Sequence, residues 1–212
     1  MKFNLSDFGK HKNFAPLSLT RPIGSLRVGI LTNTQRYAKY LPEAELGFHT
    51  ETYLEEKYPS VDSTLTVNAC IIPNQDFIAA IVNIEENSSL FLDKLLLAKK
   101  GNGEKQINFL GEAPVILNER WDIFQLNHTV LKNDFQLITE NRSSKALSDT
   151  NLLIGSEKDL FIEEGASIEG SILNTINGPI YVGENAEIME GSMVRGGLAL
   201  CHSATIKMGA KI

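Results

Sequence analysis

The sequence predicts an α/β domain over residues 1–152, followed by the beginning of a left-handed parallel β-helix, built from hexapeptide repeats, over residues 153–212. Two observations lead to this division. Segments with strand and helix patterns alternate in the first part of the chain, and aliphatic residues recur at every sixth position in the last part. A chain of 212 residues is long enough for two domains that each bury a hydrophobic core.

The strands of the first domain are predicted from short apolar runs that end at polar residues or at proline. A run of β-favouring residues stops at Pro73, and a second run is interrupted by a turn at Asp93-Lys94. The expected strands are Lys2–Leu5, Leu46–His49, Leu65–Ile72 and two strands within Leu90–Leu97.

Two helices are predicted from their capping residues. Thr32 and Gln35 have the spacing of a capping box, so we expect a helix that ends at Pro42. Asn74 can cap a second helix. Its apolar face would consist of Phe77, Ile78, Ile81 and Val82.

An aliphatic residue occupies the same place in seven successive six-residue repeats. These residues are Ile176, Val182, Ile188, Val194, Leu200, Ile206 and Ile212. In a solenoid a short strand turns a corner every six residues, and each repeat sends one aliphatic side chain into a narrow interior. A helix of about 3.6 residues per turn does not keep a period of six on one face. An irregular, glycine-rich β-meander is the alternative, but the strict spacing argues against it.

Small residues and glycines accompany the repeats. Ala186 and Ala204 lie two positions before an aliphatic residue, where a corner leaves little room, and Gly191 and Gly209 suit corners with a positive φ. The sequence stops at Ile212, which is itself a repeat position. Because an open solenoid end exposes strand edges, we expect a truncated solenoid or an end that another chain covers.

Composition narrows the class of protein. Twenty Lys and Arg against 26 Asp and Glu give a net charge of −6, and no basic run could bind nucleic-acid phosphates. No apolar stretch has the length of a signal peptide or a membrane span, so we expect a cytoplasmic protein with neither nucleic acid nor membrane as a partner. Cys70 and Cys201 show no metal-binding or disulfide spacing and are expected to be buried thiols.

Candidate phosphate-binding residues lie in the first 30 positions. Gly9 and Lys10 follow the first expected strand, where backbone N–H groups and a cation often bind phosphate, although such residues are more often plain surface. Arg21 and Arg27 stand in an otherwise apolar segment with Pro and Gly. Arg suits bidentate contacts with phosphate. Pairing of both arginines with nearby carboxylates is an equal alternative.

Several segments together resemble a known family. They are Pro16–Pro22, Leu26–Thr32, Val67–Ala69, Trp121–Asn127, Ser148–Asn151, Gly178–Gly183, Ile188–Ser192, Leu200–Cys201 and Lys207–Lys211. The chain resembles bacterial sugar nucleotidyltransferase-like proteins related to the bifunctional N-acetylglucosamine-1-phosphate uridylyltransferase/glucosamine-1-phosphate acetyltransferase. The resemblance covers nearly the whole chain, and the repeats are its most specific part.

The resemblance implies a function in UDP-N-acetylglucosamine biosynthesis or a related pathway. The first domain would join a nucleoside triphosphate to a hexose or N-acetylhexosamine 1-phosphate with Mg²⁺, and the β-helix would form a homotrimer. Arg21 and Arg27 would be the catalytic cations, Gly9, Lys10 and Thr20 would bind the nucleotide phosphates, and Asn68 and Asp122 would face the sugar. Acetyl transfer from acetyl-CoA would require a longer chain.

The sequence departs from the family pattern at the phosphate loop. Family members carry Gly-x-Gly-Thr-Arg and then Pro-Lys, whereas this chain has His11 at the second Gly, Asn13 at the Arg and Ile23 at the Lys. No metal-binding aspartates can be placed. Either Arg21 and Arg27 supply the positive charge, or the domain is a non-catalytic nucleotide-sugar-binding or scaffolding module. Acyl transfer alone is a third alternative, with His202 the single histidine of the repeats.

Overall fold

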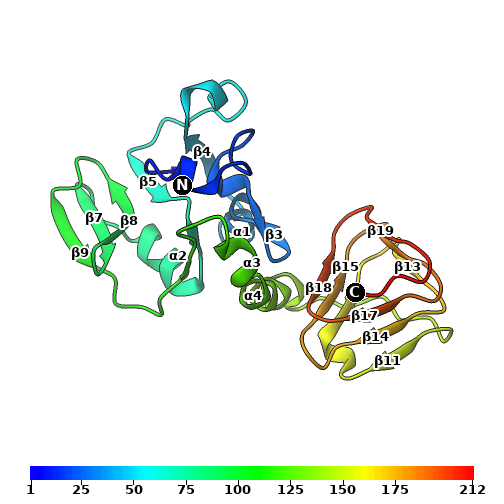
Figure 1. The fold of residues 1–212 in the computed structure, drawn as a ribbon. Helices are drawn as coiled ribbons and strands as arrows, with labels where there is room; N and C mark the ends of the chain where they lie inside the picture. The colour runs from blue at the N-terminus through cyan, green and yellow to red at the C-terminus, as the bar shows by residue number, and fades with distance from the viewer. The chain divides into compact units, whose positions relative to one another are not determined.

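The computed structural model describes all residues from 1 to 212, and the chain divides into two compact units. The first unit contains Met1–Arg27 and Leu31–Gln125, and the second contains Val28–Ile30 and Leu126–Ile212. The sequence placed the domain boundary after residue 152. In the structure the helix over Asn127–Thr139 is grouped with the repeats in the second unit. Each unit is described by itself below (Figure 1).

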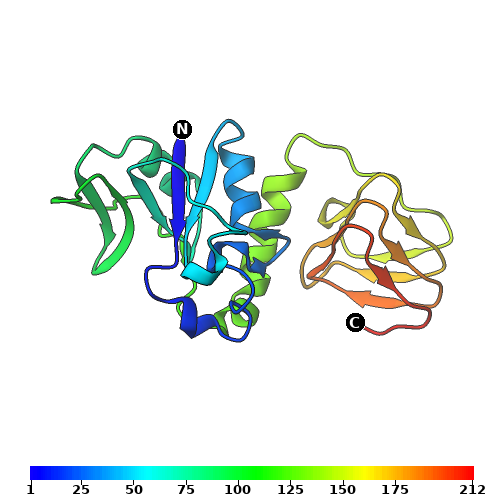
Figure 2. The ribbon, with the colours of Figure 1, turned by 90° about the horizontal axis from the view of Figure 1, so that it is seen from above.

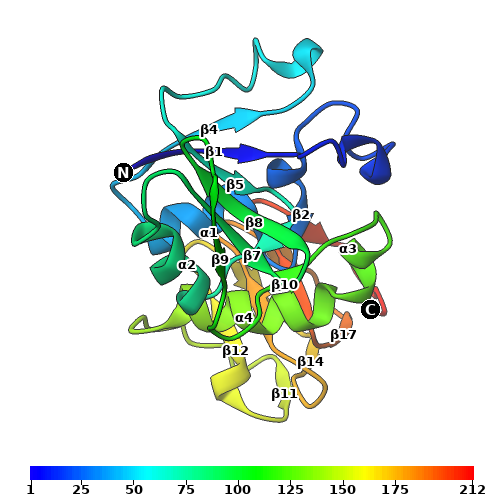
Figure 3. The same ribbon diagram turned by 90° about the vertical axis from the view of Figure 1, so that its left-hand side faces the viewer.

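A six-stranded mixed sheet forms the centre of the first unit. Its strand order is β4 (Glu45–His49), β1 (Lys2–Ser6), β5 (Leu65–Asn68), β8 (Leu95–Lys100), β7 (Ser88–Leu92) and β9 (Lys105–Asn108). β1 is parallel to β4 and β5, β8 is antiparallel to β5 and β7, and β9 is parallel to β7. Figure 3 shows β4 and β1 side by side. The carboxyl ends of β4, β1 and β5 therefore meet at one edge.

The helices of this unit begin where their caps predict. α1 (Asn33–Tyr40) has a full capping box, in which Thr32 Oγ1 accepts from Gln35 N at 3.2 Å and Gln35 Oε1 accepts from Thr32 N at 2.9 Å. Asn74 Oδ1 accepts from Phe77 N at 2.9 Å at the start of α2 (Gln75–Val82). Phe77, Ile78 and Ile81 are buried as expected, but Val82 is half exposed because it lies off that face of the helix.

The run Leu65–Ile72 is not one strand. It is broken at Ala69-Cys70 into β5 and β6 (Ile71–Ile72), and β6 pairs antiparallel with β10 (Val115–Ile116). The other elements of the unit are short. They are β2 (Arg27–Val28), β3 (Leu31–Thr32), α3 (Asp122–Gln125), η1 (His11–Phe14), η2 (Ile23–Ser25) and η3 (Thr52–Leu54).

Three parallel three-stranded sheets form the second unit, and the chain visits them in turn three times. The first sheet contains β11 (Leu152–Ile154), β14 (Ile172–Asn174) and β17 (Met193–Arg195). The second contains β12 (Leu160–Ile162), β15 (Ile180–Val182) and β18 (Leu198–Leu200), and the third β13 (Ser167–Ile168), β16 (Glu187–Ile188) and β19 (Thr205–Ile206). The other elements are α4 (Asn127–Thr139) and η4 (Glu157–Asp159). The coils lie on top of one another (Figure 2).

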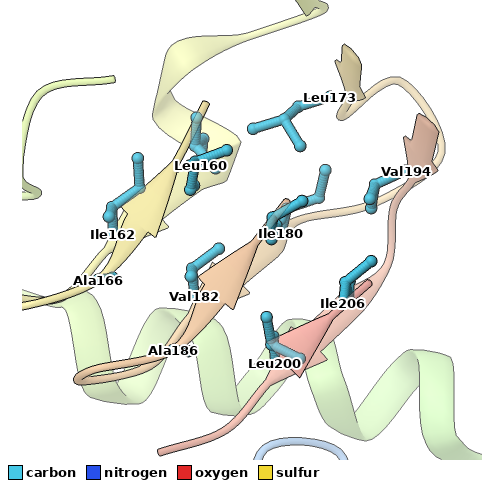
Figure 4. Close-up of a cluster of buried hydrophobic side chains, with 12 residues drawn as sticks. Leu160, Ile162, Ala166, Leu173, Ile180, Val182, Ala186, Val194, Leu200 and Ile206 are labelled. Carbon is cyan, nitrogen blue, oxygen red and sulfur yellow. The ribbon is translucent and has the colours of Figure 1, made fainter. Parts of the chain in front are cut away.

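The spacing of the coils explains the six-residue period. Ile180 pairs with Leu198, and Ile188 pairs with Ile206, so equivalent positions in successive coils are 18 residues apart. One coil therefore contains three six-residue repeats. Five predicted interior residues are buried: Val182, Ile188, Val194, Leu200 and Ile206. Figure 4 shows the side chains of this interior, including Leu160 and Ile180 from the neighbouring coils.

The predicted inward position of Ile176 and Ile212 is wrong. Their side chains are 69% and 52% exposed. Ile176 lies in the corner between β14 and β15, and the first coil is longer than the next, since Leu160 pairs with Ile180. The extra residues shift Ile176 out of phase with the interior. Ile212 continues past β19 and exchanges backbone hydrogen bonds with Met193 and Arg195 of β17.

The segment before the first coil covers its exposed strand edge. Lys145 N donates to Ile162 O at 2.9 Å, and Ser144 Oγ accepts from Ile162 N at 2.9 Å. Further along, Asn151 Oδ1 accepts from Ser171 N and Asn151 Nδ2 donates to Ile168 O. These contacts satisfy backbone groups that an open edge would leave unpaired.

An ion pair fastens the same segment to the second sheet. Arg142 makes a bidentate contact with Glu163, with N···O distances of 3.0 and 2.6 Å, and its guanidinium lies 5.0 Å from the centre of the Phe161 ring. The Tyr181 hydroxyl donates to Glu163 Oε1 at 2.8 Å. Burial, and then the hydrogen bond to Glu163, raise the pKa of Tyr181, so the hydroxyl keeps its proton.

Helix α4 packs against the corner that contains Ile176. A Cβ atom at Gly178 would lie 2.7 Å from His128 Cε1, and one at Gly197 would lie 3.2 Å from Leu131 Cδ2. Glycine at these positions therefore permits the close approach of the helix.

No helix of the chain is both long and apolar enough to cross a membrane.

The two isoleucines of the repeat register provide a matched test. Ile188→Ala should lower the free energy of unfolding of the second unit by about 2–4 kcal/mol, because Ile188 is 1% exposed and its loss leaves a cavity. Ile176→Ala should change it by less than about 0.5 kcal/mol. Urea unfolding followed by circular dichroism measures both. Equal losses for the two variants would contradict the assigned interior.

Candidate functional site

The carboxyl ends of β4, β1 and β5 form the edge at which parallel strands usually bind ligands. β1 ends at Ser6 and is followed by Asp7, β4 ends at His49, and β5 ends at Asn68. The chain connects β1 first to β4 on one side and then to β5 on the other, which makes β1 the point where the strand order reverses. The loop after β1 is therefore the centre of the candidate site.

This loop leaves β1 with an unusual backbone. Phe8 and Gly9 have φ values of 41° and 74°, in the left-handed region. Gly9 is exposed, and a Cβ atom built there would have no neighbour within 4 Å. The positive φ favours glycine, and the open space allows a ligand to approach the backbone closely. This geometry supplies the reason for a glycine, and the phosphate-binding role of Gly9 stays a prediction.

Lys10 and Asp122 are brought to the same place by Asn118. Lys10 Nζ donates to Asn118 Oδ1 at 3.3 Å. Asp122 Oδ2 accepts from the backbone N–H groups of Asn118 and Glu119, at 2.6 and 2.9 Å. Asp122 thus holds the turn that positions the partner of Lys10. The sequence analysis assigned Lys10 to phosphate and Asp122 to sugar, and it did not single out Asn118.

Two further contacts join the same segments. Asn13 Nδ2 donates to Glu119 Oε1 at 3.3 Å, and an Arg120 guanidinium N–H donates to the carbonyl oxygen of Ala15 at 3.4 Å. The loop after β1 and residues 118–122 therefore form one continuous surface, although more than 100 positions separate them in the chain.

A buried carboxylate fixes the base of the loop. Asp7 is 3% exposed, and its Oδ1 accepts from Ile23 N at 3.0 Å. Its Oδ2 lies 2.8 Å from His11 Nδ1 and accepts from Thr50 Oγ1 at 2.6 Å. Asp7 therefore holds three segments together: the loop, the chain after β4, and the segment that carries the two arginines. The sequence analysis did not select Asp7, although a carboxylate next to the first apolar strand, four residues before a histidine, was a visible signal.

Asn68 has backbone partners. Its Nδ2 donates to Leu96 O at 2.9 Å, and its Oδ1 accepts from Cys70 N at 3.0 Å. Asn68 thus ends β5 and turns the chain toward β6, and its contact with a sugar stays a prediction.

Burial raises the pKa of the Cys70 thiol to about 12, while the positive charge of Lys10 acts in the opposite direction.

The other predicted residues, Thr20, Arg21 and Arg27, are exposed and follow the loop within about 20 positions of the chain. Thr20 and Arg21 are exposed, in a turn where Arg21 N donates to Ser18 O at 3.1 Å. Arg21 precedes Ile23, whose N–H binds Asp7. Arg27 is exposed in β2. The role of both guanidinium groups as catalytic cations stays a prediction.

The side chains do not form a metal cage. No group of three or more His, Cys, Asp or Glu side chains converges at a distance suited to a metal ion. Asp7 has three hydrogen-bond partners within the chain, and one oxygen of Asp122 accepts from two backbone N–H groups. The residues present therefore do not fit a resident Mg²⁺ ion held by several carboxylates.

A cavity of about 510 Å³ in the first unit lies elsewhere. It lies between α2 and β9 and is lined mainly by apolar side chains, among them Ile84, Leu90 and Phe109. None of the predicted site residues lines it. The candidate site therefore rests on the geometry of the strand ends and not on this cavity.

Comparison with protein families gives a match. Residues 4–143 match the profile of a family described as sugar nucleotidyl transferase. The matched region is more than half of the chain, begins within β1 and ends before β11, so it contains nearly all of the six-stranded sheet and the loop after β1. No curated protein sequence gives a match.

The raised pKa of Cys70 can be tested by thiol reactivity. At pH 8, native Cys70 should react with dithionitrobenzoate at least about 100-fold more slowly than Cys201, because burial keeps the thiol protonated and inaccessible. The Cys201→Ser and Cys70→Ser variants each leave one thiol for the comparison. A Cys201→Ser protein that reacts equally fast in the native and the urea-unfolded state would contradict this environment.

Proposed function

The chain belongs to the sugar nucleotidyl transferase family, and on this basis we propose that it joins a nucleoside triphosphate to a hexose or N-acetylhexosamine 1-phosphate and releases pyrophosphate. The observation that carries the proposal is the position of Lys10. This cation lies on a loop with an open backbone at the ligand-binding edge of the sheet, and the loop is within the region that matches the family.

The chemistry requires stabilisation of negative charge. An oxygen of the sugar phosphate attacks the α-phosphorus, the bond from that phosphorus to the bridging oxygen breaks, and pyrophosphate leaves with the electron pair. Lys10, with Arg21 and Arg27 as further cations, would stabilise the charge on the phosphoryl oxygens. Gly9 would let the triphosphate approach the backbone, with Thr20 beside it. Asn68 and Asp122 would shape the sugar end through the turns that they hold.

Magnesium enters the proposal only with the nucleotide. A magnesium ion bound to a triphosphate is held mainly by phosphate oxygens and water and needs few protein ligands. Since the side chains do not fit a metal cage, no step is assigned to a metal held by the chain.

We further propose that the second unit is a left-handed parallel β-helix. Support comes from the three parallel sheets that the chain visits in turn and from the aliphatic interior at a six-residue period. In such a protein the solenoid would hold several copies of the first unit together, as a trimer.

A second candidate is a nucleotide-sugar-binding protein without turnover. His11 stands where the family pattern has a glycine, and it is tied to the buried Asp7. A loop built in this way could hold a nucleotide without the cations that drive its transfer.

Pyrophosphate release separates the two candidates. The 212-residue chain should release pyrophosphate from UTP, or from another nucleoside triphosphate, when N-acetylglucosamine 1-phosphate or another hexose 1-phosphate is added with Mg²⁺. A coupled phosphate assay measures the release. Nucleotide binding without release would favour the binding protein, and absence of both would contradict either function.

Lys10 is the residue to substitute first. Lys10→Ala should raise the Kd for the nucleoside triphosphate about 10-fold or more, because a charge-assisted contact with phosphate is lost. Lys39→Ala, which removes an exposed lysine from the last turn of α1, is the matched control and should leave the Kd unchanged. Titration calorimetry measures both. Equal affinities of the wild type and Lys10→Ala would remove Lys10 from the site.

A further inference from the structure

One exposed aromatic ring at the candidate site is held by a buried histidine. Tyr53 lies in η3, directly after β4, and its side chain is 61% exposed. Its hydroxyl lies 3.1 Å from His11 Nε2, and the two rings meet edge to face with their centres 6.2 Å apart. An exposed tyrosine normally samples several rotamers, and this contact favours one of them.

His11 is itself fixed. It is 3% exposed, and its Nδ1 lies 2.8 Å from Asp7 Oδ2. An ionised carboxylate can only accept, so Nδ1 carries the proton between them, and in the neutral ring Nε2 accepts from the Tyr53 hydroxyl. Asp7, His11 and Tyr53 thus form a chain of hydrogen bonds from the buried end of β1 to the surface.

The backbone beneath Tyr53 is anchored by the same carboxylate. Thr50 Oγ1 donates to Asp7 Oδ2 at 2.6 Å, and the neighbouring Leu54 is buried in the core. The ring therefore presents a rigid apolar face to solvent beside the ligand-binding edge of the sheet. Such a face costs little conformational entropy when a ligand stacks on it.

The loop after β1 contacts two flanks through consecutive residues. Lys10 reaches Asn118 on one flank, and His11 reaches Tyr53 on the other. A nucleotide has the same division, with anionic phosphates at one end and a flat aromatic base at the other.

We propose that Tyr53 is the stacking platform for the nucleobase, held in place by His11 and Asp7, with the phosphates directed toward Lys10. This inference rests on the proposed function, since it requires a nucleotide at the loop. Stacking on an aromatic face is tolerant of base identity, because every base has a π face. The platform binds the base as such, and the choice among bases falls to other contacts.

A ligand without a base isolates the platform. In titration calorimetry with the full chain, Tyr53→Ala should raise the Kd for UTP about 10-fold, as expected for the loss of one stacked base, and leave the Kd for inorganic triphosphate within about twofold of the wild type. Tyr53→Phe keeps the ring and should lose about twofold to threefold. Tyr58→Ala removes an aromatic ring from the same segment, where it packs on Phe48, and should leave both affinities unchanged.

The outcomes are separable. If the wild type binds UTP and Tyr53→Ala binds it equally well, the platform is wrong and the family function stands. If Tyr53→Ala weakens UTP and inorganic triphosphate equally, Tyr53 supports the loop and not the base. If a parallel titration with the hexose 1-phosphate shows that Tyr53→Ala loses only this ligand, the ring faces the sugar and the proposal is overturned. A wild type that binds no nucleoside triphosphate overturns both this inference and the proposed function.

Discussion

The site depends on one buried carboxylate. Asp7 stands at the end of the central strand, almost without solvent, and a carboxylate in such a place is stable only when its oxygens are paired. Its partners come from three separate segments: Ile23, His11 and Thr50. The need to satisfy one charge therefore determines the path of the loop after β1, the place of the arginine-bearing segment and the position of the chain after β4. Gly9, Lys10 and Tyr53 acquire their geometry from this constraint.

A different constraint organises the second unit. Its interior is a single column of aliphatic side chains with small residues at the corners, so it has little freedom to change size. Where the chain adds residues, between β14 and β15, the addition is displaced outward and α4 packs on it. The first coil would have an unpaired edge, and residues 144–151 cover it with backbone and side-chain hydrogen bonds. The segment between α4 and β11 is thus part of the packed structure of the second unit and not a free linker.

Local sequence signals predicted the secondary-structure elements more reliably than they predicted the contacts between distant residues. The caps at Thr32 and Asn74 and the five central aliphatic repeats act over a few residues, and the structure confirms each of them. Ile176 shares the same period but lies exposed in a corner, because extra residues there shift it out of phase with the interior. The spacing of residues in the sequence does not reveal where such extra residues are accommodated. Gly9 and Lys10 were selected from the sequence and lie in the loop after β1, while Asp7, His11 and Asn118 were missed. The four-residue spacing of Asp7 and His11 was a visible signal, but the contact of His11 with Tyr53 and that of Asn118 with Lys10 join residues distant in the chain, which no spacing rule reveals.

The amino-acid sequence by itself determined the alternation of strands and helices, the caps and the six-residue column of aliphatic side chains. Each of these follows from interactions between residues close in the chain, or from a repeat that stacks on itself. Only the tertiary structure decided that Lys10 meets Asn118, that Asp122 holds a turn, and that His11 connects a buried aspartate to an exposed tyrosine. The physical reason is that the free energy of a buried charge or hydrogen-bond donor depends on its partners, and the fold determines which partners lie within hydrogen-bond distance.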